Sequence, residues 1–156
     1  MTTNVTRLLA LNHIPYETRS YPVDESDLSG VHAAAAIGMP PEQLFKTLVL
    51  TGAKGDLFVC VIPCAEEVDL KKAARVMGEK SAAMLPVKQL LEKTGYVRGG
   101  CSPIGMKKKL PTFIDETALL HERIAVSAGV RGTMALIDPN HLIDYTGAKL
   151  ADLTLV

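Results

Sequence analysis

The spacing of apolar and polar residues along the chain predicts short helices that alternate irregularly with short strands. Apolar positions recur at helical spacing in five places, and each run follows a polar cap or precedes a glycine. The predicted helices begin near Val5, cover Val31–Ile37, Leu70–Met77 and Val87–Thr94, and begin again after Asp138.

Runs of apolar or alternating residues that are too short for helices predict seven strands. Tight turns, such as the one formed by Gly52 and Gly55, join neighbouring strands and favour a mixed or largely antiparallel sheet over a purely parallel one. The 156 residues contain no repeat, linker or low-complexity tract, so we expect a single domain spanning 1–156. The expected strands are Tyr16–Tyr21, Phe45–Leu50, Leu57–Ile62, Ser81–Leu85, Thr112–Asp115, Ile124–Ser127 and Met134–Ile137.

Composition and charge exclude several classes of protein. No apolar run approaches the roughly 20 residues of a membrane span, and no basic segment precedes an apolar core at the start, so we expect no signal peptide. Three cysteines at no framework spacing suit free thiols in a reducing compartment, which predicts a cytoplasmic protein. With 17 basic and 17 acidic residues, any RNA binding must come from a local patch.

Lys46 is the first residue with candidate chemistry. It lies in the extended segment Phe45–Leu50 and shares one face with Leu48 and Leu50, while the other face is also largely apolar. Lysine is almost never fully buried without a partner, and desolvation disfavours its charge. Lys46 therefore needs an anion, an opening to solvent or a chemical role. The alternative is an edge-strand lysine that snorkels to the surface.

The segment Gly99-Gly100-Cys101-Ser102-Pro103-Ile104-Gly105 is the second candidate. Its three glycines allow the backbone to approach a ligand closely and to turn N–H groups towards it. Such arrays bind phosphate or a polarised carbonyl oxygen. The segment matches neither the P-loop nor the dinucleotide fingerprint, and a plain tight turn is the alternative.

Two further segments carry cations close to small residues. Ser127-Ala128-Gly129-Val130-Arg131-Gly132 follows a predicted strand and is typical of an anion-receiving turn, although Arg131 could instead form a surface ion pair. Lys107-Lys108-Lys109 directly follows the glycine-rich segment. A charge run of this kind usually lies on a solvated face, but its position makes attraction of an RNA backbone a second interpretation.

Other catalytic arrangements have weaker support. Cys101 has no histidine close in sequence, although pairing in space with His121 or His141 stays open. Cys60 and Cys64 are not a Cys-x-x-Cys pair, and no second pair completes a zinc site. We therefore expect anion-binding and positioning groups, with no metal and no catalytic triad.

Taken together, the segment Phe45-Lys46-Thr47-Leu48-Val49 and the two glycine-containing segments resemble the YbaK/EbsC family, whose members are relatives of the editing domain inserted in bacterial prolyl-tRNA synthetases. The similarity runs in order over nearly the whole chain. The resemblance implies a mixed α/β fold in which a curled, barrel-like mixed β-sheet is flanked by helices. It also implies deacylation of mischarged tRNA, of Cys-tRNA(Pro) in the free-standing type, without a metal or organic cofactor.

The resemblance also implies roles for individual residues. Lys46 matches the essential lysine, which is thought to hold the phosphate near the terminal adenosine, and the glycine-rich loop would surround the ester carbonyl with N–H groups. The substrate's own thiol is thought to attack the ester. This chain departs from the family pattern at Ser29, Val130 and Met134, which leaves substrate choice open. The expected site comprises Lys46 as the catalytic residue and Tyr21, Thr47, Gly99, Gly100, Cys101, Ser102, Pro103, Gly105, Ser127, Gly129 and Arg131 as substrate-binding residues.

The leading hypothesis is a deacylase of Cys-tRNA(Pro), and of Cys-tRNA(Cys) as a further substrate. Its expected partners are the acceptor end of an aminoacylated tRNA and prolyl-tRNA synthetase, with neither a membrane nor DNA. A deacylase of alanyl- or seryl-tRNA is the nearest alternative. A non-catalytic RNA- or nucleotide-binding module would use the same anion-binding groups but would protect the ester, and a metal-dependent hydrolase is a third possibility.

Overall fold

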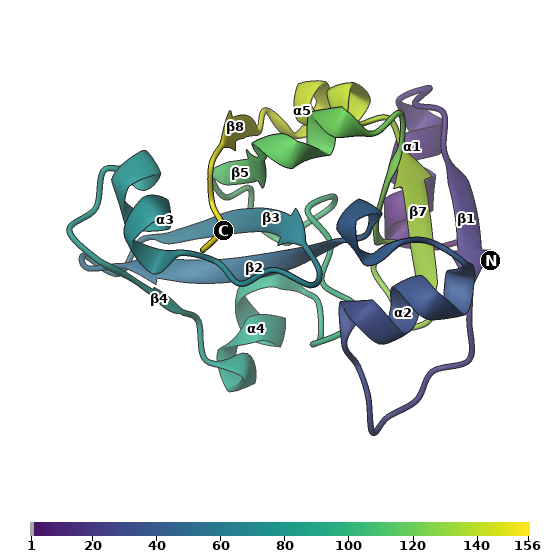
Figure 1. The fold of residues 1–156 in the computed structure, drawn as a ribbon, viewed down its shortest axis with the longest axis horizontal. Helices are drawn as coiled ribbons and strands as arrows, with labels where there is room; N and C mark the ends of the chain where they lie inside the picture. The colour runs from purple at the N-terminus through teal and green to yellow at the C-terminus, as the bar shows by residue number, and fades with distance from the viewer. Residues whose placement is uncertain (1) are drawn as a thin grey trace.

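A computed structural model describes residues 2–156, which form two β-sheets with helices packed around them (Figure 1). In the larger sheet, β2 (Phe45–Gly52) pairs antiparallel with β3 (Leu57–Pro63) and with the short β4 (Ala82–Met84). The strand β3 then pairs in parallel with β5 (Thr112–Asp115), and β5 pairs in parallel with β8 (Lys149–Ala151). The order is therefore β4-β2-β3-β5-β8.

The smaller sheet is fully antiparallel. Its central strand β7 (Thr133–Ile137) lies between β1 (Glu17–Ser20) and β6 (Ile124–Ser127). An isolated parallel bridge between Leu44 and Ala125 connects the two sheets. The mixed pairing that the tight turns predicted is confirmed.

The expectation of a curled, barrel-like sheet is wrong. The strands of residues 2–156 form two separate sheets, and neither closes on itself. The reason lies at the start of β2, where Leu44 bridges to β6 but the following residues do not. Beyond Leu44 this edge of β2 borders a cavity, so the two sheets separate there.

The five predicted helices are confirmed, and their ends follow from local capping. Asp69 accepts hydrogen bonds from the N–H groups of Lys71 and Lys72 at the start of α3, and Asp138 caps α5 in the same way. Four helices end at a glycine with positive φ, a conformation that other residues adopt only with strain. The helices are α1 (Asn4–Leu11), α2 (Gly30–Ile37), α3 (Leu70–Met77), α4 (Val87–Thr94) and α5 (Pro139–Thr146), with 3₁₀ turns at Pro41–Gln43 and Glu116–Leu120.

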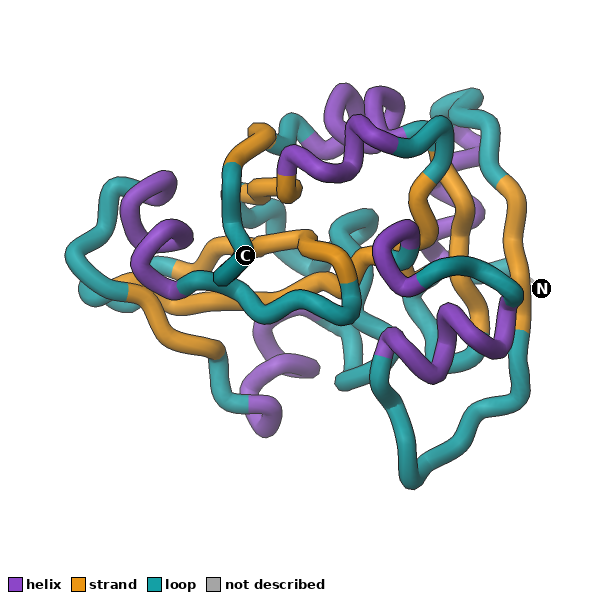
Figure 2. The backbone as a smooth tube through the Cα atoms, viewed as in Figure 1, coloured by secondary structure: helices purple, strands orange, loops and turns teal. Residues whose placement is uncertain are grey.

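The core confirms that β2 has two covered faces. Phe45 and Val49 belong to the main apolar cluster, which also includes residues of α1 and α5, whereas Leu50 belongs to a cluster beneath α3. A third cluster lies between α2 and the smaller sheet. Along the backbone, α2 and α4 lie on the same side of β2, and the long loop 21–29 projects beyond α2 (Figure 2). No helix in residues 2–156 is long and apolar enough to span a membrane.

Candidate functional site

A cavity of about 550 Å³ opens beside β2, between the first turn of α2, the segment Arg98–Cys101 and the start of α4. Leu85 and Leu90 contribute to a largely apolar wall, and Lys46 projects from β2 as a charged group within it. Six of the residues expected at the site line this cavity, namely Tyr21, Lys46, Thr47, Gly99, Cys101 and Ser127.

Lys46 is half-buried, and its side chain has no hydrogen-bond or ion-pair partner within residues 2–156. Its charge reaches the neighbouring Cys64. Burial raises the pKa of the Cys64 thiol, and the ammonium of Lys46 opposes that rise. A cation without a partner, enclosed by apolar walls, binds an anion more strongly than it would in water. The position of Lys46 therefore suits a phosphate or carboxylate.

Thr47 presents unused hydrogen-bonding groups next to Lys46. Its hydroxyl is buried and has no partner in the described chain. The carbonyl of Val49 accepts a hydrogen bond from Leu85, on the edge of β2 that faces away from β3. Backbone groups of alternate residues point to the same edge, so the N–H and C=O of Thr47 also point there. Since β4 pairs only with Leu50–Gly52, Thr47 offers a donor and an acceptor to the cavity.

The turn that carries Gly99 is held from behind by Arg131. The Nε of Arg131 donates to the carbonyl oxygen of Arg98 at 2.8 Å, and its guanidinium also pairs with Glu25 at 3.1 Å. A side chain at Gly100 would come within 3.2 Å of the backbone nitrogen of Arg131. Arg131 itself does not line the cavity, which agrees with the alternative of an ion pair.

Gly105 and Gly129 meet behind the cavity, at the ring of Tyr96. A Cβ at Gly105 would lie 3.0 Å from the Tyr96 hydroxyl, and a Cβ at Gly129 would lie 3.2 Å from its ring. The hydroxyl of Tyr96 donates to the carbonyl oxygen of Ile104. Burial raises the pKa of Tyr96 to about 12, which keeps the donor protonated at neutral pH. Tyr96, absent from the sequence prediction, therefore fastens the two glycine-containing segments together.

Ser102 and Ser127 differ in their access to the cavity. Ser102 is fully buried and accepts from the N–H of Ile104, and neither it nor Pro103 lines the cavity. Ser127 lines the cavity and accepts a hydrogen bond from the N–H of Gly129 at 3.1 Å, so the cavity wall is joined to the turn behind it.

Cys101 does not form a nucleophile pair with histidine. It lines the cavity, but burial raises the pKa of its thiol to about 12, so the reactive thiolate is absent at neutral pH. His121 and His141 line a different hollow, beside Arg123 and Asp138. In residues 2–156, no three His, Cys, Asp or Glu side chains are arranged to hold a metal ion.

Further residues that the motifs did not include also line the cavity. Cys64, Met134 and Arg98 belong to its wall, and Ser29 lies at its edge. Ser29 and Met134 are two of the three positions where the chain departs from the family pattern. These departures could therefore have identified residues at the border of the cavity from the sequence. The third, Val130, lines a separate hollow behind the glycine-rich loop, together with Lys107.

The family model of the aminoacyl-tRNA editing domain matches residues 28–145, which include β2, the glycine-rich loop and the turn that follows β6. The chain belongs to the aminoacyl-tRNA editing domain family. Among curated members, EbsC of Enterococcus faecalis, a candidate Cys-tRNA(Pro)/Cys-tRNA(Cys) deacylase, is 41% identical over 97% of this chain and 93% of its own.

Solved structures share this fold. A crystal structure of a candidate trans-editing enzyme for prolyl-tRNA synthetase is 26% identical, with a TM-score of 0.83 over 100% of this chain and 99% of that one. A hypothetical protein of known structure is 20% identical, with a TM-score of 0.88 over 97% of this chain and 99% of that one, and shows a shared fold. The shared fold thus covers nearly the whole chain, and the family model covers residues 28–145 of it.

Proposed function

We propose that this protein is a trans-editing deacylase that removes mischarged cysteine from Cys-tRNA(Pro), and also from Cys-tRNA(Cys). The observation that carries the proposal is the unpartnered Lys46 ammonium beside the unused backbone and hydroxyl groups of Thr47, in a cavity without a nucleophile–histidine pair. The 41% identity to EbsC supports cysteine as the amino acid. The reaction belongs in the cytoplasm, where tRNAs are charged.

In this reaction the protein positions the ester rather than attacking it. Lys46 holds a phosphate next to the terminal adenosine, and the N–H groups of Gly99 and Thr47 hold the ester carbonyl. The thiol sulfur of the substrate attacks the carbonyl carbon. A C–S bond forms, the C–O bond to the ribose breaks, and the thiol proton passes to the leaving ribose oxygen, which leaves a cysteine thiolactone and free tRNA.

Positioning alone supplies much of the rate. Holding reacting groups at attack distance contributes several kcal/mol, up to about 7–11 kcal/mol for well-oriented intramolecular reactions. The apolar wall that includes Leu85, Leu90 and Met134 keeps competing water away from the ester. Serine and alanine esters lack the thiol, so cysteine is released preferentially.

The biological need follows from the size of the amino acid. A synthetase pocket for proline rejects a near-isostere by only about 1–3 kcal/mol, so cysteine is attached in error and a second site must remove it. Small and neutral in net charge, the protein reads only the acceptor end, and prolyl-tRNA synthetase supplies the rest of the selection.

The decisive experiment measures deacylation of Cys-tRNA(Pro), with Ala-tRNA(Pro) as the alternative substrate. We expect Lys46→Ala to lower kcat/KM by at least about 100-fold, as for the loss of one preorganised charge-stabilising donor. Lys54→Ala, at the exposed turn between β2 and β3, is the matched control and should leave the rate unchanged.

Each outcome decides between the hypotheses. Equal activity of Lys46→Ala and the native protein would overturn the assigned role of Lys46. Preferential release of alanine would move the substrate to another small amino acid. Protection of the ester by the native protein would identify a binding module instead of an enzyme.

A further inference from the structure

The two sides of the cavity mouth differ in polarity and charge. One side, the α4 lip, comprises Met84, Val87, Lys88, Leu91 and Arg98. The other side, the acidic loop, comprises Asp24, Glu25 and Asp27, directly before α2. Both sides adjoin the cavity, because Val87 and Arg98 line it from one side and Leu28 and Ser29 from the other.

The α4 lip exposes a large part of its apolar side chains to solvent. The exposed fractions are 45% for Met84, 60% for Val87 and 58% for Leu91. Val87 and Leu91 are four residues apart on α4 and therefore lie on one side of the helix. Exposed apolar side chains at the entrance to a cavity that holds a cation offer a surface on which the face of an unpaired base can lie.

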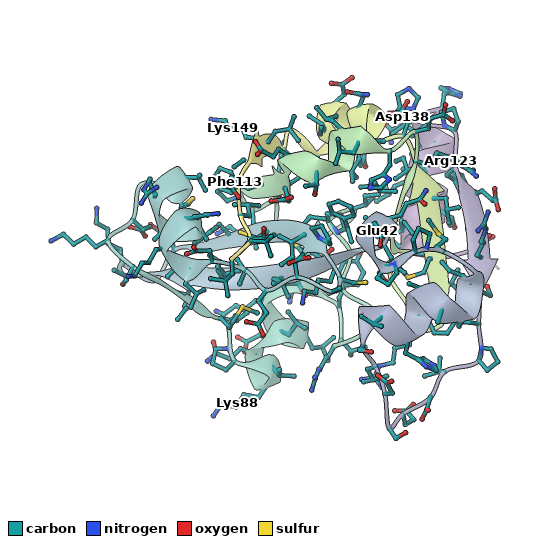
Figure 3. All side chains as sticks on the ribbon, viewed as in Figure 1. Glu42, Lys88, Phe113, Arg123, Asp138 and Lys149 are labelled. Atoms are coloured by element: carbon teal, nitrogen blue, oxygen red, sulfur yellow. The ribbon has the colours of Figure 1, made fainter. Side chains whose placement is uncertain are left out.

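The same lip carries cations. Lys88 extends outward from α4, at the end of the molecule away from α5 (Figure 3). Arg98 lines the cavity mouth, and neither side chain has an ion-pair partner in the described chain. Glu92, one turn further along α4, is offset by its neighbour Lys93. With Lys46 inside, three cations mark a path from the surface into the cavity.

The acidic loop has the opposite character. Asp24 accepts hydrogen bonds from the N–H and hydroxyl of Ser26, and Asp27 accepts one from the N–H of Ser29. Hydrogen bonds from the side chain and then the N–H of Ser26 (for Asp24) and of Ser29 (for Asp27) hold the pKa of both carboxyl groups below the usual range, so both stay ionised at neutral pH. Two fixed negative charges repel a phosphate backbone from this side.

We propose that the single-stranded 3′ end of the RNA enters the cavity across the α4 lip, with its phosphates beside Lys88 and Arg98 and an unpaired base on Val87 and Leu91. The acidic loop keeps the strand away from α2. This inference rests on the proposed function, because it takes the ligand to be an aminoacylated RNA end.

The test measures the affinity of the native protein and its variants for uncharged tRNA. Lys88→Glu and Arg98→Glu should each weaken binding by about three- to tenfold, and each should reduce the slope of log affinity against log salt by about one. Lys54→Glu is the matched control, an equal charge reversal at an exposed turn remote from the cavity lining. Asp24→Asn, which keeps an oxygen for Ser26, should strengthen binding.

A second measurement isolates the base contact. Val87→Ser should weaken binding of intact tRNA but not of tRNA that lacks its three 3′-terminal nucleotides. Val87 and Leu91 are both exposed, so replacing either of them with serine should not alter the fold. Equal affinities of native protein, Lys88→Glu and Arg98→Glu for intact tRNA would overturn the proposed path. Loss of synthetase binding alone in Leu91→Ser would assign the lip to a protein partner and overturn it as well.

The same variants separate this inference from the proposed function. If the native protein binds tRNA through Lys88 and Arg98 but deacylates nothing, the path stands and the enzymatic function is wrong. If the native protein deacylates Cys-tRNA(Pro) and both charge reversals leave its Kd and kcat/KM unchanged, the function stands and the path is wrong.

Discussion

Removing the hydroxyl of Tyr96 tests whether the two glycine-containing segments are held together from behind the cavity. In Tyr96→Phe the ring stays in place against Gly105 and Gly129, and the hydrogen bonds of the hydroxyl to the carbonyl of Ile104 and to the side chain of Asn4 are lost. Ile104 is fully buried, so its carbonyl gains no water in exchange.

The expected magnitude follows from that burial. An ordinary intramolecular hydrogen bond contributes about 0.5–1.5 kcal/mol net, whereas a buried group left without a partner costs about 1–3 kcal/mol. We therefore expect Tyr96→Phe to lower the free energy of unfolding by about 1–3 kcal/mol. The turn at Gly99 should also lose its fixed position, because Gly100 follows Tyr96 by only four residues and packs on Arg131.

The assay has two readouts. Urea denaturation gives the free energy of unfolding, and deacylation of Cys-tRNA(Pro) well below the unfolding midpoint gives kcat and KM. We expect kcat to fall while tRNA affinity changes little, since Tyr96 lies behind the cavity wall and touches no ligand. Tyr16→Phe, at a partly exposed tyrosine outside the cavity, is the matched control. Unchanged stability together with native kcat in Tyr96→Phe would refute the fastening role.

Four other predictions follow from particular contacts. A Cβ at Gly30 would lie 2.5 Å from the Cβ of Cys64, so Gly30→Ala should cost about 1–3 kcal/mol in urea denaturation, and Cys64→Gly in the same chain should restore part of it. Thr47→Val removes a buried, unpartnered hydroxyl and should keep or raise stability by about 1 kcal/mol while slowing deacylation; a lowered melting temperature with native activity would contradict this. Cys101→Ser should retain deacylation, because no covalent intermediate forms on that sulfur, and an inactive variant with a native circular dichroism spectrum would disprove it. The pKa values of Cys60 and Cys101 are raised from 9.0 to about 12, so the native state favours the neutral thiols; the stability that these two thiols contribute should be constant below about pH 9 and be lost between about pH 9 and 12 in urea titrations, and a stability that rises over this range would contradict the assigned burial.

The sequence predicts the elements of this fold well wherever local chemistry sets their ends. Asp69 and Gly78 mark the two ends of α3, and the apolar run Leu57–Ile62 corresponds to β3. The three-residue strand β8 was not predicted, because Lys149–Ala151 is defined by its pairing with β5 rather than by any periodicity of its own. The barrel expectation failed for a similar reason, since sheet closure depends on which strand edges meet.

The residues of the site also differ in whether the local sequence reveals them. Lys46 stands out in the sequence because a cation in an apolar strand needs an explanation, and the structure places it in the cavity. Tyr96 and Arg98 carry no local signal, and their importance appears only when distant segments pack together. Arg131 was expected to contact substrate, and that contact stays a prediction; in the structure Arg131 links Glu25 to the carbonyl of Arg98 outside the cavity.

The open edge of β2 also bears on aggregation. Unpaired strand edges invite strands from other chains, and proteins usually blunt them with charge, proline or a covering element. Here the unpaired groups of Thr47 face a cavity bounded by the first turn of α2 and the start of α4, which leave room for a nucleotide-sized ligand but shield the edge from an extended chain. The enclosure that makes these backbone groups available to a ligand therefore also prevents a strand of another molecule from pairing with this edge. Variants that loosen α4 should aggregate before they unfold.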